Sequence, residues 1–496
     1  MVTAGTAWLQ RRLGLFVIAV TAIRLAAAAI IPLTEDEAYY RIWAQHLHLG
    51  YYDHPPMVAW WIALGQRIVG NSALGVRLLP VLGAGIASIL VAAITRDLGA
   101  SSATALRASL WYNATITIGL GGILATPDAS ATFFWVLTLW ALGRLHAGRS
   151  SRWWILAGLA AGLACISKYS ALFLGPGVLL WLASTSKGRE ALKTPWPWLA
   201  AMLAGAVFST NLVWNAQHHW LTMTKQFGRV APEHLNPKHL VDLLATQFLL
   251  LNPMIAVLAA RSLPFAWRDR EGSFTLPVLT GLPFGAYLLL HALHDRVQAH
   301  WPVPLFAGLV IAAALMVERD SPESRAGHLR AVAIGTGYAV SLGLIAFIAF
   351  GSMPALGRKD PVLTLRGWPV FAKTIDARRK DAGAAWIGTV AYGTAAQLAN
   401  TGSITSPLLQ VIERERYLDA GLPPDQTLPG LIVDLDRRVV ASDLATCFTR
   451  VRALDQIVRG ESEGHGIGYD VFLVSGPKVD LVLQGCPNDL GKKPKK

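Results

Sequence analysis

The chain has 496 residues, of which 53% are hydrophobic and 15% charged, and its mean hydropathy is +0.41. Soluble globular domains carry roughly a quarter charged residues, so this composition indicates a membrane protein. The formal net charge of +13 does not indicate a nucleic-acid partner, because the basic residues lie in small groups between apolar segments instead of forming one stripe or tail.

Apolar segments recur through residues 14–353, each near the ~20 residues that a helix needs to cross a bilayer. The first segment is too long for a removable signal peptide and lacks a flanking cleavage site, so we expect it to stay as an anchor. Arg24 in its middle is costly in lipid and should face the bundle interior. We expect eleven transmembrane helices, at 14–33, 76–95, 106–124, 129–147, 153–167, 169–184, 196–214, 240–260, 275–293, 301–317 and 331–353.

Basic residues concentrate on alternate connections between these segments, sixteen on one set and eight on the other. The positive-inside rule puts the richer set in the cytoplasm, so everything after residue 354 should be external. Ten of the 13 histidines also fall on the external connections, which indicates that polar chemistry gathers on that face. The richer set comprises Arg11, Arg12 and the connections 96–107, 144–152, 187–193, 261–270 and 319–330.

The first external connection begins with "PLTEDEAYYRIW" and carries three consecutive acids. Thr34 and Glu37 have the spacing of a capping box, which predicts a helix starting there and running along the membrane surface. Asp36 is left over by the cap and can point toward a cavity above the bundle, where a carboxylate suits general-base chemistry. "HPPMVAWWIALG" predicts a second surface helix that starts at Pro55 and Pro56.

Cations on the external side are candidates for binding a phosphate. Lys168 lies in the very short connection "SKYS", close to the bundle mouth, although a lysine there can also simply extend its ammonium to the interface. Arg296, Lys225 and Arg229 are the other candidates. Asp128 is a second carboxylate at an external segment end, and the sequence equally favours a role as N-cap of the following helix.

Histidine pairs in the external connections raise the question of a metal. A His-x-His pair at His46 and His48 and a His-His pair at His218 and His219 have no defined third ligand. The alternative is that interface loops tolerate polar aromatic side chains. The sequence therefore leaves a divalent metal open and assigns no cofactor.

After residue 354 the pattern changes to short strands alternating with helical segments, for example "AAWIGTVAY", "PGLIVDLDRRVV" and "GYDVFLVSGP". We expect a transmembrane domain at 1–354, a small external α/β domain at 355–490 and a disordered tail at 491–496. No dinucleotide glycine fingerprint, phosphate-binding loop or zinc-type cysteine pattern occurs in this domain. Cys447 and Cys486 can form a disulfide if the compartment is oxidising.

Several motifs together resemble bacterial membrane glycosyltransferases of the GT-C fold, in the branch of protein O-mannosyltransferases and lipid A aminoarabinose transferases. They are the acidic pair after the first span, "HPP" before a Trp-rich helix, "TPDA", "SKYS", "NAQHHW", "HWPVP", "RGWPVF" and "AYGTAAQLA". The resemblance implies an inverting transfer of a sugar from a polyprenyl-phosphate carrier to an acceptor outside the cytoplasm. It also implies a bacterial inner-membrane protein whose active site and C-terminal domain face the periplasm.

The family's acidic pair falls on Asp36 and Glu37, which implies that Asp36 acts at the acceptor and Glu37 supports it. The aminoarabinose branch has a lysine before its Pro-Pro pair, where this chain has His54 preceded by Asp53. This departure puts phosphate binding by that position in doubt, because a neutral imidazole offers a single donor. The hypothesis is that Asp36, Glu37 and Asp128 serve catalysis. The residues expected to bind substrate are Lys168, His54, Asp53, Arg296, Arg229 and His300.

The sequence leaves the sugar open among hexose, uronic acid and aminopentose, and the acceptor open among lipid A or lipopolysaccharide, a glycan and a protein. Expected partners are the carrier-linked donor, this acceptor and membrane lipids. The alternative class is a transporter or flippase, which usually places ionisable groups near the bilayer midplane on broken helices within two repeated halves. Only Arg24 is clearly at the midplane, and the sequence has no matching halves.

Overall fold

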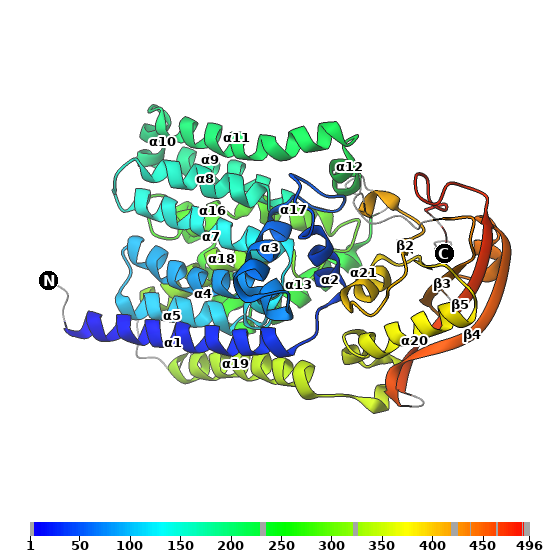
Figure 1. Cartoon of the computed structure of the whole chain (residues 1–496). Helices are drawn as coiled ribbons and strands as arrows, with labels where there is room; N and C mark the ends of the chain where they lie inside the picture. The colour runs from blue at the N-terminus through cyan, green and yellow to red at the C-terminus, as the bar shows by residue number, and fades with distance from the viewer. Residues whose placement is uncertain are drawn as a thin grey trace. The chain divides into compact units, whose positions relative to one another are not determined.

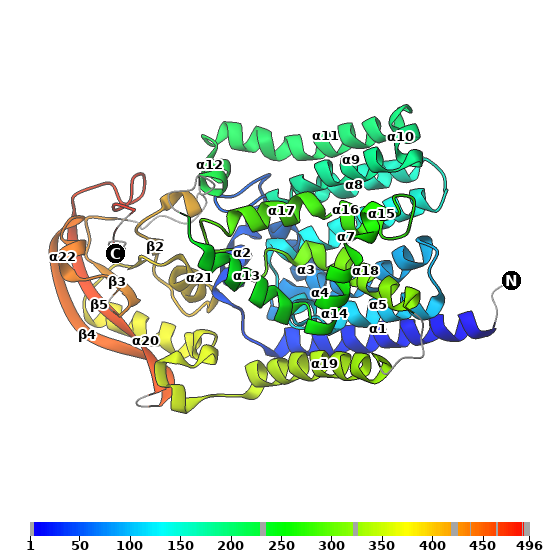
Figure 2. The same cartoon turned by 180° about the vertical axis from the view of Figure 1, so that it is seen from behind.

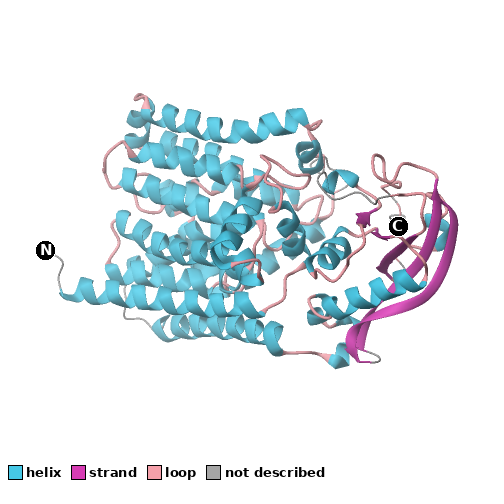
Figure 3. Cartoon of the chain, in the orientation of Figure 1, coloured by secondary structure: helices cyan, strands magenta, loops and turns pink. Residues whose placement is uncertain are grey.

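The computed structural model describes residues 4–228, 235–320, 326–417, 425–436, 438–462, 465–488 and 490. The chain divides into two compact units: a helical unit of residues 1–30 and 48–346, and a C-terminal unit of residues 31–47 and 347–496. Figure 3 colours the helices and strands that make up these units. The sequence assigned residues 31–47 to the transmembrane domain, whereas here they join the C-terminal unit, because helix α2 (Glu35–Trp43) packs against helix α21 (Tyr392–Asn400).

The described part of the helical unit consists of helices that run roughly side by side (Figures 1 and 2). Three of the connections contain short 3-10 helices: η1 (Gly121–Ile123), η2 (Tyr169–Phe173) and η3 (Val303–Leu305). The α-helices are α1 (Ala4–Ile30), α3 (Met57–Val69), α4 (Ala73–Asp97), α5 (Ser102–Ala114), α6 (Ile116–Gly119), α7 (Pro127–His146), α8 (Trp153–Cys165), α9 (Leu174–Ser184), α10 (Ser186–Leu192), α11 (Trp196–Gln217), α12 (Leu221–Phe227), α13 (Pro237–Leu250), α14 (Pro253–Ser262), α15 (Phe265–Arg268), α16 (Thr275–Leu279), α17 (Leu282–His291), α18 (Phe306–Arg319) and α19 (Ala326–Phe350).

Each of the eleven predicted segments coincides with one of these helices or with a group of them. Among the described residues, four helices are long and apolar enough to cross a membrane, and the number rises to seven if each of three sharply bent helix pairs counts as one span. The four are residues 8–30, 73–97, 196–217 and 330–350. The coarse prediction of a polytopic helical membrane fold therefore holds, while the count of eleven crossings stays a prediction.

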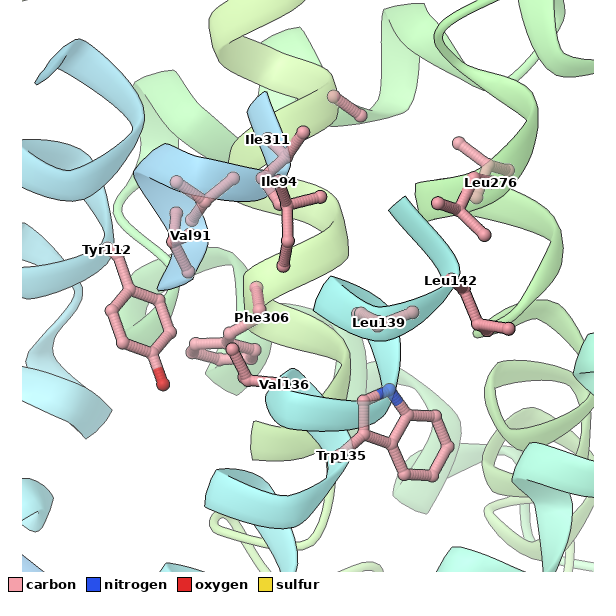
Figure 4. Close-up of a cluster of buried hydrophobic side chains, with 14 of the residues drawn as sticks. Val91, Ile94, Tyr112, Trp135, Val136, Leu139, Leu142, Leu276, Phe306 and Ile311 are labelled. Atoms are coloured by element: carbon pink, nitrogen blue, oxygen red, sulfur yellow. The ribbon is translucent and has the colours of Figure 1, made fainter. Parts of the chain in front are cut away.

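A continuous apolar core joins α4, α5, α7, α16 and α18 (Figure 4). Trp135 and Val136 from α7, Phe306 from α18 and Val91 from α4 are all at most 1% exposed. Dense packing of this kind fixes the helices relative to one another within the unit. Outer helices instead expose large apolar side chains, such as Met202 at 69%, as expected for surfaces that face lipid.

Polar contacts join the arginine- and lysine-rich connections at one end of the helical unit. Arg144 binds Asp97 at 2.8 Å, and Arg261 binds Asp320 at 3.0 Å. The backbone N–H groups of Ser101 and Ser186 donate to Glu318 and Glu271, at 2.9 and 2.5 Å. The connections that the positive-inside rule assigns to the cytoplasm thus share one end of the unit.

Arg24 forms a hydrogen bond with α6, next to a sharp bend between two helical segments. The segment of α6 and η1 is bent by 119° against α7, so its backbone carbonyls lack regular helical partners. The Arg24 guanidinium, which is 2% exposed, donates through Nη2 to the Ile118 carbonyl of α6 at 2.8 Å. As predicted, this arginine faces the interior of the helical unit, where it gives the Ile118 carbonyl a hydrogen-bond partner.

The described part of the C-terminal unit contains a five-stranded mixed sheet with the order β2-β1-β3-β5-β4. Its strands are β1 (Trp386–Thr389), β2 (Leu408–Gln410), β3 (Gly430–Leu435), β4 (Phe448–Ser462) and β5 (His465–Pro477). Strand β1 pairs in parallel with β2 and β3, while β5 pairs antiparallel with β3 and β4. The remaining elements are α2, η4 (Pro354–Lys359), η5 (Pro361–Thr364), α20 (Trp368–Asp381), α21, η6 (Arg414–Tyr417) and α22 (Ala441–Leu444).

Alternate residues of the buried strand β3 face opposite sides of the sheet, as the period of two requires. Leu431 and Val433 pack with residues of α20 and α21, while Ile432 packs on the other side with Cys447 and Cys486. Those two cysteines form the disulfide that the sequence permitted, with Cα atoms 5.6 Å apart. The bond links the start of β4 to the chain's last described segment.

Replacing both Cys447 and Cys486 by serine should destabilise the C-terminal unit by about 2–4 kcal/mol, because the unfolded chain gains the freedom that the bond removes. The expected result is a lower unfolding temperature by calorimetry in detergent under non-reducing conditions. Cys165→Ala is the matched control, since this free thiol lies in α8 of the helical unit. Equal unfolding temperatures for the wild type and the double variant would contradict the prediction.

Candidate active site

The three consecutive acidic side chains at the start of α2 lie in three different environments. Glu37 is fully buried and completes the predicted capping box: its carboxylate accepts from the Thr34 backbone N–H at 3.0 Å. The Thr34 hydroxyl in return accepts from the Glu37 N–H at 3.2 Å. Glu37 therefore supports the start of the helix, and the capping prediction is confirmed.

Asp36 is the exposed member of the three acids. Its Oδ1 accepts a hydrogen bond of 2.7 Å from the hydroxyl of Tyr392, the first residue of α21. No hydrogen bond to Oδ2 is present among the described residues. One oxygen of this carboxylate is thus held by the protein, and the other can accept a proton from a ligand because the residue is exposed.

Glu35 faces the sheet of the C-terminal unit. Its carboxylate lies over Gly393, where an added Cβ would overlap it, so a larger residue at this position would displace the Glu35 side chain. Burial raises the pKa of the Glu35 carboxyl, an effect opposed by the positive charge of Arg459 and reinforced by the neighbouring Asp36. Glu35 thereby packs α2 onto the N-terminal end of α21.

Further contacts along α21 hold the segment that carries the acids. The Gln397 side-chain amide donates to the Leu33 carbonyl at 2.8 Å, and Asn400 accepts from the Arg41 guanidinium. Tyr392 itself packs against Tyr39, with ring centroids 5.1 Å apart, and the Arg416 guanidinium lies 4.6 Å from the Tyr392 ring centroid. The sequence marked "AYGTAAQLA" only as a family motif and did not reveal Tyr392 as a partner of Asp36.

The Asp434 carboxylate accepts hydrogen bonds from the backbone that follows the C-terminal end of strand β1. Both backbone N–H groups that follow β1, of Val390 and Ala391, donate to the Asp434 carboxylate at 2.7 and 2.6 Å. Burial raises the pKa of Asp434, while these hydrogen bonds act in the opposite direction. In nucleotide-binding α/β folds such a position receives a phosphate, and here the protein fills it with its own carboxylate.

A second charged cluster lies in the helical unit and joins three predicted site residues. The Lys168 ammonium binds both carboxylate oxygens of Asp128, at 2.7 and 2.8 Å. His300 Nε2 lies 3.5 Å from the same carboxylate, and the Lys168 Nζ lies 5.7 Å from the Trp301 ring centroid. The Lys168 and Asp128 side chains are only 13% and 9% exposed, so the pair is held in a largely dry setting where its attraction is strong.

Asp128 is not the N-cap of α7, which was one of its two predicted roles. Thr126 takes that position and accepts a hydrogen bond of 3.3 Å from the Ala129 N–H. Pro127 then occupies the first helical turn, where its missing N–H costs nothing. Asp128 follows within that turn, and its carboxylate is free to meet Lys168.

The loop that carries Asp53 and His54 lies against the connection that carries Lys168. The Met57 N–H, just after the Pro-Pro pair, donates to the Ile166 carbonyl at 3.2 Å. On the other side, the Asn211 side chain accepts from the Tyr169 hydroxyl and donates to the Leu49 carbonyl, both at 2.7 Å. Both predicted residues are half-buried within this loop.

The other predicted cations have different surroundings. Arg296 is exposed in the connection after α17, where its backbone N–H donates to the neighbouring Asp295 carboxylate. Lys225 lies 4.8 Å from the Tyr52 ring centroid, and Arg229 lies outside the described residues. Within the described ranges, no group of three or more His, Cys, Asp and Glu side chains could hold a metal ion.

Comparison with solved structures defines the class of protein. The fold matches that of ArnT from Cupriavidus metallidurans in the apo state, with a TM-score of 0.64 over 95% of this chain and 98% of that chain, at 14% identity. ArnT bound to undecaprenyl phosphate gives a TM-score of 0.65, covering 94% of this chain and 98% of that one, at 13% identity. The chain is therefore a membrane protein with the fold of the GT-C glycosyltransferases, as the sequence resemblance implied.

Sequence comparisons agree with this fold. The family model described as Dolichyl-phosphate-mannose-protein mannosyltransferase matches residues 53–214. The lipid A galacturonosyltransferase RgtD of Rhizobium johnstonii is 31% identical over 294 residues, which are 57% of this chain and 60% of that protein. The undecaprenyl phosphate-alpha-4-amino-4-deoxy-L-arabinose arabinosyl transferase 1 of Pseudomonas fluorescens is 32% identical over 28% of this chain and 25% of its own length. The chain thus spans less than two thirds of these relatives.

Proposed function

We propose that this protein transfers a sugar from a polyprenyl-phosphate carrier to lipid A or a related envelope acceptor, with inversion at the anomeric carbon. The observation that carries the proposal is the exposed Asp36 carboxylate, which a capped helix and the Tyr392 hydroxyl hold in place. An exposed carboxylate that is held through one oxygen is what a general base at an acceptor hydroxyl requires.

In the proposed reaction, the acceptor hydroxyl gives its proton to the Asp36 carboxylate while its oxygen forms a bond to the anomeric carbon. The bond from that carbon to the phosphate oxygen of the carrier breaks, and its electron pair leaves with the polyprenyl phosphate. Because the oxygen enters opposite the leaving phosphate, the configuration inverts. Glu37 supports this chemistry by fixing the start of α2.

Lys168 is our candidate for the leaving phosphate, because an ammonium stabilises the negative charge that develops there. The paired Asp128 holds its ammonium at a fixed position, and His300 next to Asp128 adds a neighbouring donor. Asp53 and His54 lie on the loop packed against the Lys168 connection, so we propose them as further substrate contacts, together with Arg296 and Arg229.

The names of two relatives support a proposal about the substrates. The name of RgtD gives lipid A as the acceptor and galacturonic acid as the sugar. The name of the Pseudomonas fluorescens relative gives undecaprenyl phosphate as the carrier and aminoarabinose as the sugar. The filled phosphate position beside Asp434 argues against a nucleotide-sugar donor in the C-terminal unit. We therefore propose a lipid-linked uronic acid or aminopentose as the donor.

The test is mass spectrometry of envelope lipids and glycans from cells with and without the gene, followed by transfer with the purified protein. The protein in detergent receives undecaprenyl-phosphate-linked galacturonic acid or aminoarabinose and purified lipid A. Sugar-modified lipid A should appear only with the active protein. Unchanged lipid A together with a changed glycan or glycoprotein would redirect the acceptor, and no change at all in either experiment would refute the proposal.

We further propose that the protein lies in the bacterial inner membrane with the arginine- and lysine-rich end in the cytoplasm and the C-terminal unit in the periplasm. Arg268→Cys and Lys380→Cys each introduce an exposed thiol, and the native cysteines are either buried or bonded. In intact spheroplasts, an impermeant maleimide should label position 380 and leave position 268 unlabelled until the membrane is opened. Labelling of both from one side would contradict this orientation.

A further inference from the structure

The C-terminal unit presents a single helix face to the segment that carries Asp36. Tyr392, Gly393, Gln397 and Asn400 of α21 each contact α2 or the residues just before it. Three of these four contacts involve atoms away from Asp36: the Glu35 side chain, the Leu33 carbonyl and the Arg41 guanidinium. Only the Tyr392 hydroxyl reaches the Asp36 carboxylate, at 2.7 Å.

The placement of that hydroxyl is itself constrained. Tyr392 is the first residue of α21 and follows directly on the turn that Asp434 holds through the Val390 and Ala391 N–H groups. Its ring packs against Tyr39, at a centroid distance of 5.1 Å, and against the Arg416 guanidinium at 4.6 Å. Arg416 is in turn bonded to Glu413 at 2.7 Å, and Glu413 has the unfavourable backbone angle φ of 44°.

Backbone strain of this kind persists only where the surrounding contacts over-determine it, and such strain is often found at functional sites. Here it accompanies the arginine that packs on the Tyr392 ring. A tyrosine whose ring is held by two such contacts delivers its hydroxyl to one point in space. That point is one oxygen of a carboxylate that is otherwise exposed to solvent.

We propose that Tyr392 is a positioning residue for the reaction: its hydroxyl fixes Oδ1 of Asp36, so that Oδ2 faces the acceptor hydroxyl. This inference rests on the proposed function and extends it, because it gives the C-terminal unit a part in catalysis. An exposed aspartate without such a donor rotates among its side-chain conformers, and only a fraction of them aim an oxygen at the acceptor. Holding one oxygen selects the productive orientation before the acceptor arrives.

Tyr392→Phe is the central variant, because it removes the hydroxyl and keeps the ring contacts with Tyr39 and Arg416. A hydrogen bond to a charged group contributes enough that its loss should lower kcat by about 10- to 100-fold. KM for the lipid-linked donor should change by less than about threefold, since a group that acts only on the base leaves donor binding intact. Asn400→Ala is the matched control, since it removes a hydrogen bond between the same two helices without touching Asp36, and it should keep kcat within about twofold of the wild type.

A double-mutant cycle separates positioning from a structural role. If Tyr392 acts through Asp36, adding Tyr392→Phe to Asp36→Asn should cost no further activity, whereas a structural defect should multiply the two losses. Unchanged kcat in Tyr392→Phe, or multiplicative losses in the double variant, would overturn the inference while the wild type still transfers sugar. An inactive wild type would overturn the proposed function and this inference together.

Discussion

Asp36→Asn should lower the rate of sugar transfer by about 10² to 10⁴, the loss expected when a positioned general base is removed. The amide is nearly the same size as the carboxylate and can still accept from the Tyr392 hydroxyl, so α2 should keep its place in the C-terminal unit. The purified variant should therefore remain folded and inserted, and it should still bind undecaprenyl phosphate. The measurement is single-turnover transfer from a labelled lipid-linked donor to lipid A.

Thr34→Ala is the control for Asp36→Asn, because it attacks the same helix start without touching the proposed base. Loss of the cap should cost about 1 kcal/mol of stability, with a far milder effect on transfer. If Asp36→Asn kept more than about a tenth of the wild-type rate, the loss would be smaller than the smallest loss expected for removal of a general base. Asp36 would then not be the base. An acceptor that attacks through a phosphate would give that result, since it needs no deprotonation.

Local features of the site could be predicted from the sequence because they depend on neighbours a few positions apart. The capping box of Thr34 and Glu37 spans three residues, and both of its hydrogen bonds are present. The apolar segments could be recognised for a similar reason, because the hydrophobicity of a segment is a property of its own consecutive residues. The sequence permitted the disulfide because both cysteines fall in the same domain, but the Cα distance of 5.6 Å that allows the bond depends on the fold.

Partners that are distant in the chain could not be predicted in the same way. Tyr392 and Asp36 are separated by 356 positions, and no local pattern encodes the docking of α21 against α2. The predicted transmembrane domain at 1–354 included residues 31–47, yet their contacts group them with the C-terminal unit. Tertiary packing determines which unit a helix joins, and the periodicity of a single segment does not reveal its packing partner.

The candidate site in the helical unit illustrates both situations. The sequence identified Asp128 and Lys168 separately, each at the end of an apolar segment, but their ion pair across 40 positions depends on how α7 and the α8–α9 connection pack. The competing role of Asp128 as N-cap was excluded only by the observed bond from Ala129 to Thr126. Thr126 and Asp128 are both favoured cap residues, and preference alone does not rank them.

Lys168→Gln should weaken binding of undecaprenyl phosphate by about 10- to 100-fold, the loss expected for a charge-assisted hydrogen bond to phosphate. The single variant also strands the Asp128 carboxylate, which is 9% exposed, and breaking a buried pair in this way costs about 3–5 kcal/mol. The paired variant Asp128→Asn/Lys168→Gln removes both charges and should restore stability without restoring affinity. Asp128→Asn alone, which keeps the ammonium, should bind the carrier at least as tightly as the wild type.

Affinity is measured by titration of the detergent-solubilised protein with undecaprenyl phosphate. Lys225→Gln tests the rival cation beside Tyr52. Normal carrier affinity in the paired variant, or a larger loss in Lys225→Gln, would move the phosphate away from Lys168.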